Sequence, residues 1–112
     1  MLHIHSYGRV ATDISVKQSR DKSCLYTNFL IASHNKGNTT FIRCTAFNGL
    51  ASLLAEYFSK GDRIYIEGDL VDDIHKNNHS HKIIVENFEF IETKEEHNKN
   101  VEKHKDDNNK TG

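Results

Sequence analysis

Five segments of the chain have the residue pattern of β-strands, and this pattern constrains the fold more than any other feature. They are residues 2–16, 25–33, 41–47, 64–70 and 82–91. In the first segment, Leu2, Ile4 and Val10 occupy even positions and polar residues occupy odd ones, so we expect one face of this strand to be buried. Gly8 interrupts the strand and predicts a bulge or a bend. Polar residues at 19–23, 34–38 and 76–81 predict turns.

A single amphipathic helix is predicted between the third and fourth of these strands. Its apolar residues recur with the spacing of one helical face. They are Leu50, Leu53, Leu54, Tyr57 and Phe58. Asn48 is a candidate cap at the start of this helix, and Gly61 is a candidate cap at its end. Three strands, one helix and two strands predict an all-β fold with one helix, namely the five-stranded Greek-key barrel called the OB-fold.

The third predicted strand carries two aromatic residues and an arginine on one face. Its odd positions hold Phe41, Arg43, Thr45 and Phe47, and its even positions hold Ile42, Cys44 and Ala46. Because the even set is small and apolar, we expect it to face the core and the odd set to face outward. Exposed rings beside a cation suit an unpaired nucleic acid strand, whose bases stack on the rings while its phosphates meet the guanidinium. The alternative is that one or both phenylalanines belong to the core.

Length and composition narrow the class of protein. The 112 residues suffice for one domain, which we expect at residues 1–92, and the composition of residues 93–112 predicts a disordered polar tail. A formal net charge of -1 lacks the basic excess typical of duplex DNA binding, so any nucleic acid contact must be local. The sequence has no secretory signal pattern and no apolar run near the roughly 20 residues of a membrane span, which predicts a cytoplasmic location without membrane contact.

The residue types that carry catalysis or bind metals are present but not suitably spaced. Cys24 and Cys44 lie far apart, which favours reduced thiols over a disulfide, although the sequence leaves both open. His79 and His81 could in principle share a metal, but histidines in loops are usually only solvated. The residues that most resemble an enzyme site are Asp69, Asp72 and Asp73, which could imitate a metal-binding cluster. Tyr26 or His75 could act as an acid or base. No nucleophile and base have a spacing that defines their geometry, so we predict no catalysis and no cofactor.

Several short motifs together resemble the bacterial and phage single-stranded DNA-binding proteins, abbreviated SSB, over about residues 1–92. In order, they are Gly8-Arg9, Asn28-Phe29, Phe41-Ile42-Arg43-Cys44 with Ala46-Phe47, Glu56-Tyr57 with Ser59-Lys60-Gly61, and Tyr65-Ile66-Glu67-Gly68 with Leu70. Their order and spacing carry the likeness. The resemblance implies an OB-fold that binds single strands without sequence preference, usually as a homotetramer, with aromatic residues of the third and fourth strands stacking on bases.

The resemblance also implies which residues bind nucleic acid. They are Arg9, Phe41, Arg43, Phe47, Lys60 and His75, with Lys36, Lys76 and Lys82 as further cations on loops. Phe41 is similar to the principal stacking aromatic and Phe47 to the second. His75 falls where the family often has another aromatic on a hairpin arm, and an imidazole stacks more weakly. The arginines and lysines would contact phosphate.

The chain departs from the family pattern, and two functions remain open. It has no tryptophan, Asp72 and Asp73 stand on the arm where the family commonly has basic residues, and its last seven residues lack the family's acidic tip. One function is non-catalytic, sequence-nonspecific binding of single-stranded DNA in replication, recombination or the transfer of phage or mobile-element DNA, with the chain as a tetramer or dimer. The other is an accessory subunit in a hetero-complex with a primase, polymerase or helicase, with weak or no DNA affinity of its own.

Overall fold

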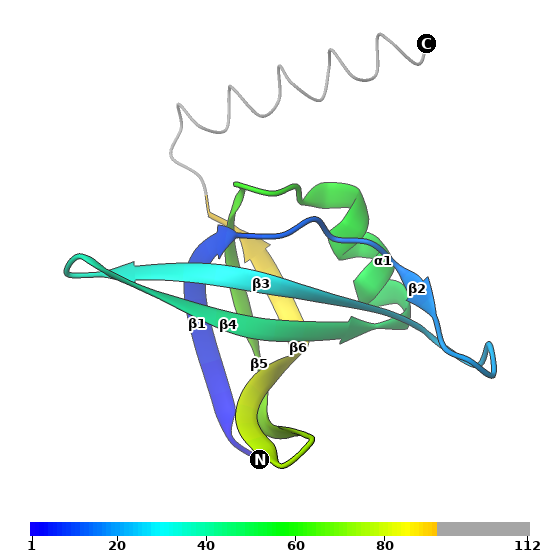
Figure 1. Ribbon diagram of the computed structural model, residues 1–112. Coiled ribbons are helices and arrows are strands. Elements are labelled where there is room, and N and C mark those ends of the chain that lie inside the picture. Colours follow the sequence, from blue (N-terminus) through cyan, green and yellow to red (C-terminus); the bar gives the residue numbers. More distant parts are fainter. Residues whose placement is uncertain (92–112) are drawn as a thin grey trace, which may run out of the picture.

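The computed structural model describes residues 1–91, which contain six strands and one helix (Figure 1). They are β1 (His3–Val10), β2 (Lys17–Gln18), β3 (Leu25–Asn35), β4 (Asn38–Phe47), α1 (Asn48–Tyr57), β5 (Arg63–His75) and β6 (Asn78–Phe90). The predicted order is confirmed, and the two-residue β2 is an addition. The predicted polar tail lies outside the described residues. Within residues 1–91, no helix has the length and apolar character needed to cross a membrane.

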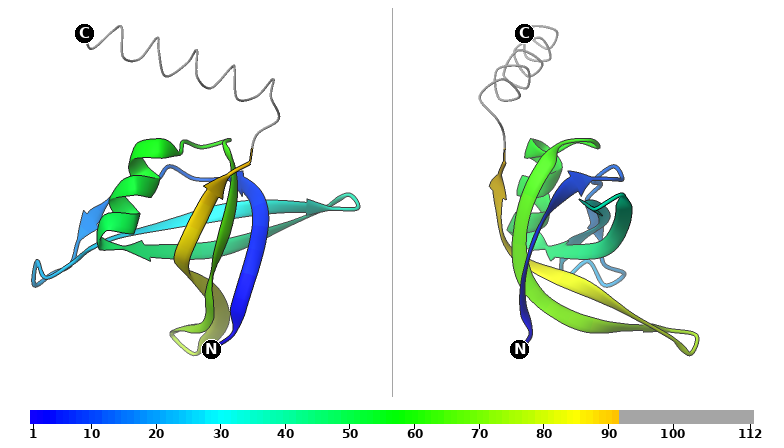
Figure 2. Two further views of the ribbon diagram at one scale, coloured as in Figure 1. Left: turned by 180° about the vertical axis from the view of Figure 1, so that it is seen from behind. Right: turned by 90° about the vertical axis from the view of Figure 1, so that its left-hand side faces the viewer.

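The strands form one sheet that closes on itself. Neighbouring strands follow the order β1-β5-β6-β4-β3-β2, and a further pairing between β1 and β3 closes the ring. The pairings are antiparallel except that of β4 with β6, which is parallel. Figure 2 shows the barrel from two further sides, with the β3–β4 and β5–β6 hairpins projecting from it. The prediction of an OB-fold is confirmed.

Gly8 allows the barrel to close. A Cβ atom at this position would lie 2.4 Å from Ile31 Cγ2 and 2.6 Å from the carbonyl oxygen of Ala32, so β1 approaches β3 this closely only because the side chain is a hydrogen. Directly after it, Arg9 pairs with Ala32, and the next residue pairs with Ile31. The glycine therefore stands where β1 begins to pair with β3, and its pairing with β5 continues through this position without the bulge that the sequence allowed.

The first strand is shorter than predicted. β1 ends at Val10, whose N–H donates to the carbonyl of Asp62 at 2.9 Å, and the N–H of Ala11 donates to Leu30 at 2.8 Å. The chain then leaves β1, and Ile14 packs against the core from a loop. The alternation beyond residue 10 was misleading because a loop that lies on the barrel also buries some of its residues and exposes others.

The turns of the two long hairpins are also shorter than predicted. Lys36-Gly37 connects β3 to β4, Lys76-Asn77 connects β5 to β6, and all four residues have positive φ angles. Type I′ turns require positive φ at both central residues. The strands continue almost to the tips, where their side chains are exposed. Polar residues therefore mark the exposed arms of the hairpins as well as the turns.

The helix α1 buries a narrower apolar face than predicted. Ala51, Leu54 and Phe58 are buried in the core, whereas Leu53 and Tyr57 are 42% and 44% exposed. The expectation that Leu53 and Tyr57 lie on the buried stripe is therefore wrong. The helix covers one end of the barrel and contacts β3 and β4, so only the side chains that point into this end are buried.

The predicted caps of α1 have other roles. Asn48 is the first helical residue, with a φ of 55°, and its Oδ1 accepts a hydrogen bond from the N–H of Leu25 at 3.1 Å. It therefore links the helix to the start of β3 and does not cap the helix. The helix ends before Phe58, and Gly61 lies in the turn beyond it, with a φ of 97°. There its N–H donates to the carbonyl of Val10 at 2.7 Å.

Both cysteines are free thiols, as predicted. Cys44 is buried in the core, and this burial raises the pKa of its thiol to about 12. The thiol therefore remains protonated near neutral pH, and it is poorly reactive because the thiolate is the reactive form.

Thr27 offers a test of the core, because its buried hydroxyl has no hydrogen-bond partner among the described residues. Replacing Thr27 with valine keeps the side-chain shape and removes this hydroxyl, so the free energy of unfolding should rise by about 1 kcal/mol in urea denaturation. Thr45→Val is the matched control, because the hydroxyl of Thr45 donates to Asn28 Oδ1 at 2.6 Å. That substitution should lower the free energy of unfolding by about 0.5–1.5 kcal/mol. Equal changes in the free energy of unfolding of both variants would contradict the conclusion that the Thr27 hydroxyl is unpaired and that of Thr45 is hydrogen-bonded.

Candidate nucleic-acid interface

Strand β4 presents the predicted aromatic and cationic residues to solvent. Phe41 and Phe47 are 60% and 42% exposed, and Arg43 between them is exposed as well. We call these three residues the β4 face. Cys44 and Ala46, at even positions, are fully buried. The predicted faces are confirmed for these five residues, and the alternative that the phenylalanines belong to the core is wrong.

The neighbouring strand β3 adds a third aromatic residue beside the β4 face. Tyr26, which is half-buried, stands directly opposite Phe47. Side chains at opposed positions of antiparallel strands share a face of the sheet. Sequence reasoning considered Tyr26 only as an acid or base and missed this placement. The two-residue turn at Lys36-Gly37 determines the register of β3 and β4, so recognising that turn would have predicted the pair.

Thr45 departs from the expectation that the odd positions of β4 face outward, because it is buried. Strand β6 lies beside β4 at this point, with Thr45 aligned to Ile84. The hydroxyl of Thr45 is used in the hydrogen bond to Asn28 on β3. Of the two odd positions between the phenylalanines, only that of Arg43 is therefore exposed.

A carboxylate of the β5–β6 hairpin holds Arg43. Arg43 Nη1 donates to Asp73 Oδ2 at 2.7 Å, and the two side chains are 63% and 21% exposed. Both residues line an open groove of about 430 Å³, together with Lys82 and Asp13. Two cations and two carboxylates leave this groove without net charge when all four are ionised. Its attraction for phosphate is correspondingly weak.

Arg9 and Lys60 lie near the end of β1. Arg9, near the end of β1, donates from Nη1 to the carbonyl of Gly61 at 2.9 Å and stands opposite Arg63 of β5. Lys60 precedes Gly61 in the exposed turn between α1 and β5. In Figure 1 this turn lies beside the end of β1, away from the middle of β4. Arg9 nevertheless lies only two strands from Phe41, because both residues pair with Ala32 of β3. Lys60 lies farther along, in the turn itself.

His75 lies at the end of the barrel opposite to Arg9. It is the last residue of β5, exposed directly before the turn of the hairpin. Strand β5 has 13 residues, so its two ends are roughly 40 Å apart along the strand. On the same arm, His81 Nδ1 lies 3.3 Å from Asp72 Oδ1. Of the six predicted site residues, Phe41, Arg43 and Phe47 thus lie together on β4, and Arg9 lies two strands from Phe41 across Ala32. Lys60 and His75 lie toward the two ends of β5.

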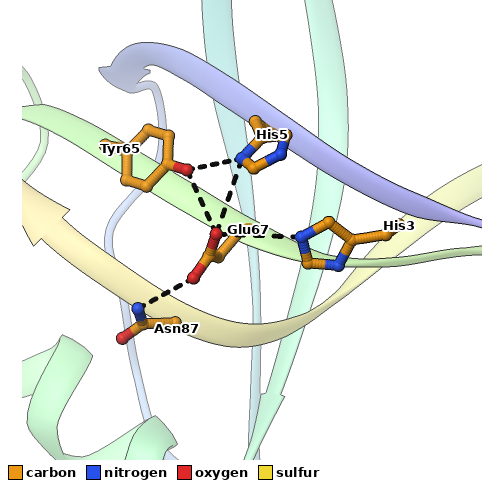
Figure 3. Close-up of polar contacts among 5 residues, drawn as sticks. All are labelled: His3, His5, Tyr65, Glu67 and Asn87. Carbon is orange, nitrogen blue, oxygen red and sulfur yellow. Dashed lines mark hydrogen bonds and ion pairs between the residues drawn. The ribbon is translucent and has the colours of Figure 1, made fainter.

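A cluster of side chains that could hold a metal occurs at a place that the sequence did not predict. Among residues 1–91, the group of metal-ligating residues that come together is His3, His5 and Glu67 (Figure 3). His79 and His81, the pair considered from the sequence, do not form such a group of three or more. The alternation in β1 already placed His3 and His5 on one face, but the glutamate belongs to β5, and its position depends on the pairing of the two strands.

Comparisons with known proteins agree with the fold. The chain matches the model of the single-strand binding protein family over residues 1–91. It is 36% identical over 72 residues to the single-stranded DNA-binding protein of Onion yellows phytoplasma (strain OY-M), which covers 60% of this chain and 69% of that protein. The SSB domain of a Synechococcus sp. protein superposes with a TM-score of 0.69 at 12% identity, over 79% of this chain and 93% of that chain. A deletion mutant of the single-stranded DNA binding protein from Thermus aquaticus gives a TM-score of 0.70 at 19% identity, over 83% of this chain and 42% of that chain.

These findings confirm the resemblance seen in the sequence. The family match spans all the described residues, and the solved structures share the fold. Proteins of this family bind single-stranded DNA and catalyse no reaction, which agrees with the prediction that the chain is not an enzyme. The chain belongs to the single-strand binding protein family.

Proposed function

We propose that the β4 face is where this protein binds single-stranded DNA, with Phe41 and Phe47 stacking on bases. The observation that carries the proposal is that two large apolar rings on one strand remain 60% and 42% exposed, although Cys44 and Ala46 of the same strand are fully buried. Each stacked base contributes about 1–3 kcal/mol, and stacking tolerates any sequence because every base has a flat face. The half-buried Tyr26 borders the same surface.

Arg43 would bind phosphate by leaving Asp73. An ion pair as exposed as this one contributes about 0–1 kcal/mol to stability, so a phosphate can replace the carboxylate at little cost. One OB-fold contacts about 4–16 nucleotides, which is enough for a bound strand to run beyond β4. Arg9 and Lys60 at one end of the barrel, and His75 at the other, are then flanking contacts.

The biological setting follows from this chemistry. A non-catalytic protein that covers exposed bases protects or presents single strands during replication, recombination or the transfer of phage or mobile-element DNA. A cytoplasmic location and assembly into a dimer or tetramer complete this proposal. Size-exclusion chromatography with light scattering measures the assembly directly.

A second candidate function is favoured by the carboxylates near the β4 face. Asp73 holds Arg43, and Asp72 on the same arm is exposed. These charges repel phosphate and suit an accessory subunit that docks onto a primase, polymerase or helicase and has little DNA affinity of its own.

Fluorescence anisotropy with a labelled oligothymidine, at two salt concentrations, separates the two functions. The first predicts tight binding that weakens as salt rises, because bound phosphates release counterions. The second predicts dissociation constants of tens of micromolar or weaker at physiological salt, as for generic electrostatic contact. The weak result would overturn the proposal for the β4 face.

Asp73→Asn tests the role of the ion pair. Freeing Arg43 should tighten binding to oligothymidine about two- to fivefold, equivalent to the 0.5–1 kcal/mol of an exposed ion pair. The slope of log affinity against log salt should change little, because Arg43 contacts one phosphate in the wild type and in the variant.

Two control variants make this test specific. Glu56→Gln makes the same change of charge on the exposed side of α1 and should have no effect. In an Arg43→Ala background, Asp73→Asn should also have almost no effect. An equal gain in both backgrounds would show that Asp73 acts through its charge alone and not through Arg43.

A further inference from the structure

We propose that His3, His5 and Glu67 form a zinc-binding site on the outer face of β1 and β5. His3 and His5 are two residues apart in β1 and so lie on the same face of the strand. Strand β5 places Glu67 directly opposite His5. The histidine side chains are 46% and 57% exposed and that of the glutamate is 25% exposed, so an ion can reach all three from solvent.

The distances between the donor atoms approach those of a tetrahedral zinc site. Glu67 Oε2 lies 3.7 Å from His3 Nε2 and 3.5 Å from His5 Nδ1. One ligand atom from each of the three residues lies within 4.8 Å of the others. Zinc bonds of about 2.0–2.2 Å in a tetrahedron separate two ligand atoms by roughly 3.3–3.5 Å. The histidine–glutamate distances therefore need to change by only a few tenths of an ångström, which rotation of exposed side chains allows.

Two neighbouring side chains hold the donor atoms in place (Figure 3). Asn87 Nδ2 donates to Glu67 Oε1 at 2.9 Å, which leaves Oε2 directed at the histidines. The Tyr65 hydroxyl donates to Glu67 Oε2 at 3.1 Å and also hydrogen-bonds His5 Nδ1, so it keeps these two atoms close together. A bound ion would replace this hydroxyl. A ligating carboxylate that is oriented by a hydrogen bond from a further residue is typical of metal sites.

The types of donor atom indicate zinc among the common divalent ions. Two imidazole nitrogens and one carboxylate oxygen match the two-histidine, one-glutamate sets that bind zinc and leave a fourth position for water. Magnesium and calcium prefer sites made of oxygen atoms. A bound zinc ion would fasten the first residues of β1 to β5.

Isothermal titration calorimetry tests the site, with zinc chloride and the untagged full-length chain freed of metal by a chelator. We expect one zinc ion per chain and no displacement by a large excess of magnesium. His5→Ala and Glu67→Ala should each weaken zinc binding more than tenfold, because each removes a ligand. Asn87→Ala should weaken it about tenfold, since loss of an orienting residue typically has an effect of this size.

A matched pair of variants separates this site from the other histidines. The chain has eight histidines. A variant that retains His3 and His5 and has alanine at the others should bind zinc as the wild type does, whereas the His3→Ala, His5→Ala double variant should not. The opposite result would overturn the proposal. Circular dichroism checks folding, and Glu67→Gln, which can still accept the hydrogen bond from Asn87, replaces any variant that fails to fold.

Discussion

Replacing both Phe41 and Phe47 with alanine should weaken binding to oligothymidine by about 2–6 kcal/mol, which is at least roughly 30-fold in Kd. The reason is that each ring would lose one stacked base, and the backbone of β4 keeps its place through its pairing with β3 and β6. Fluorescence anisotropy at constant salt measures the change. The dependence on salt should remain nearly as in the wild type, because no charge is removed.

The control for this experiment comes from α1. Leu53 and Tyr57 are 42% and 44% exposed, much like Phe47, but they lie on the helix. Their double replacement by alanine should change the affinity by less than about threefold. If the helix variant lost as much affinity as the β4 variant, exposed apolar surface in general would be responsible, and the β4 face would not be the stacking site.

Replacing Leu54 with alanine should lower the free energy of unfolding by about 2–5 kcal/mol, measured by urea denaturation. Leu54 is fully buried where α1 closes the end of the barrel, so truncation leaves a cavity as well as less buried apolar surface. For a domain of this size, such a loss is a large part of the total stability.

Leu53→Ala makes the same chemical change on the exposed side of the same helix. It should lower the free energy of unfolding by less than about 1 kcal/mol, since less apolar surface returns to water and no cavity forms. Similar losses in the two variants would mean that helix propensity dominates, and that α1 does not depend on its contact with the barrel.

The features that follow from short-range periodicity were predictable from the sequence. In a strand, alternate side chains face opposite sides whatever the strand pairs with, so the exposure of Phe41, Arg43 and Phe47 could be inferred before any partner strand was known. The same argument placed the helix between the third and fourth long strands and Leu54 in its buried stripe. It was less reliable at the edges of elements, because Leu53, Tyr57 and the residues after Val10 follow the pattern without being buried in the expected way.

Only the tertiary structure decided which side chains from different strands meet. The contact of Arg43 with Asp73, the placement of Tyr26 opposite Phe47, and the contacts of Glu67 with the histidines of β1 depend on the register between strands and on the closure of the barrel at Gly8. The sequence by itself determined the order of the elements and the faces of β4, because these depend on neighbours within a few residues. Register depends on pairing between distant segments, where a shift of one residue would move every side chain to the other face.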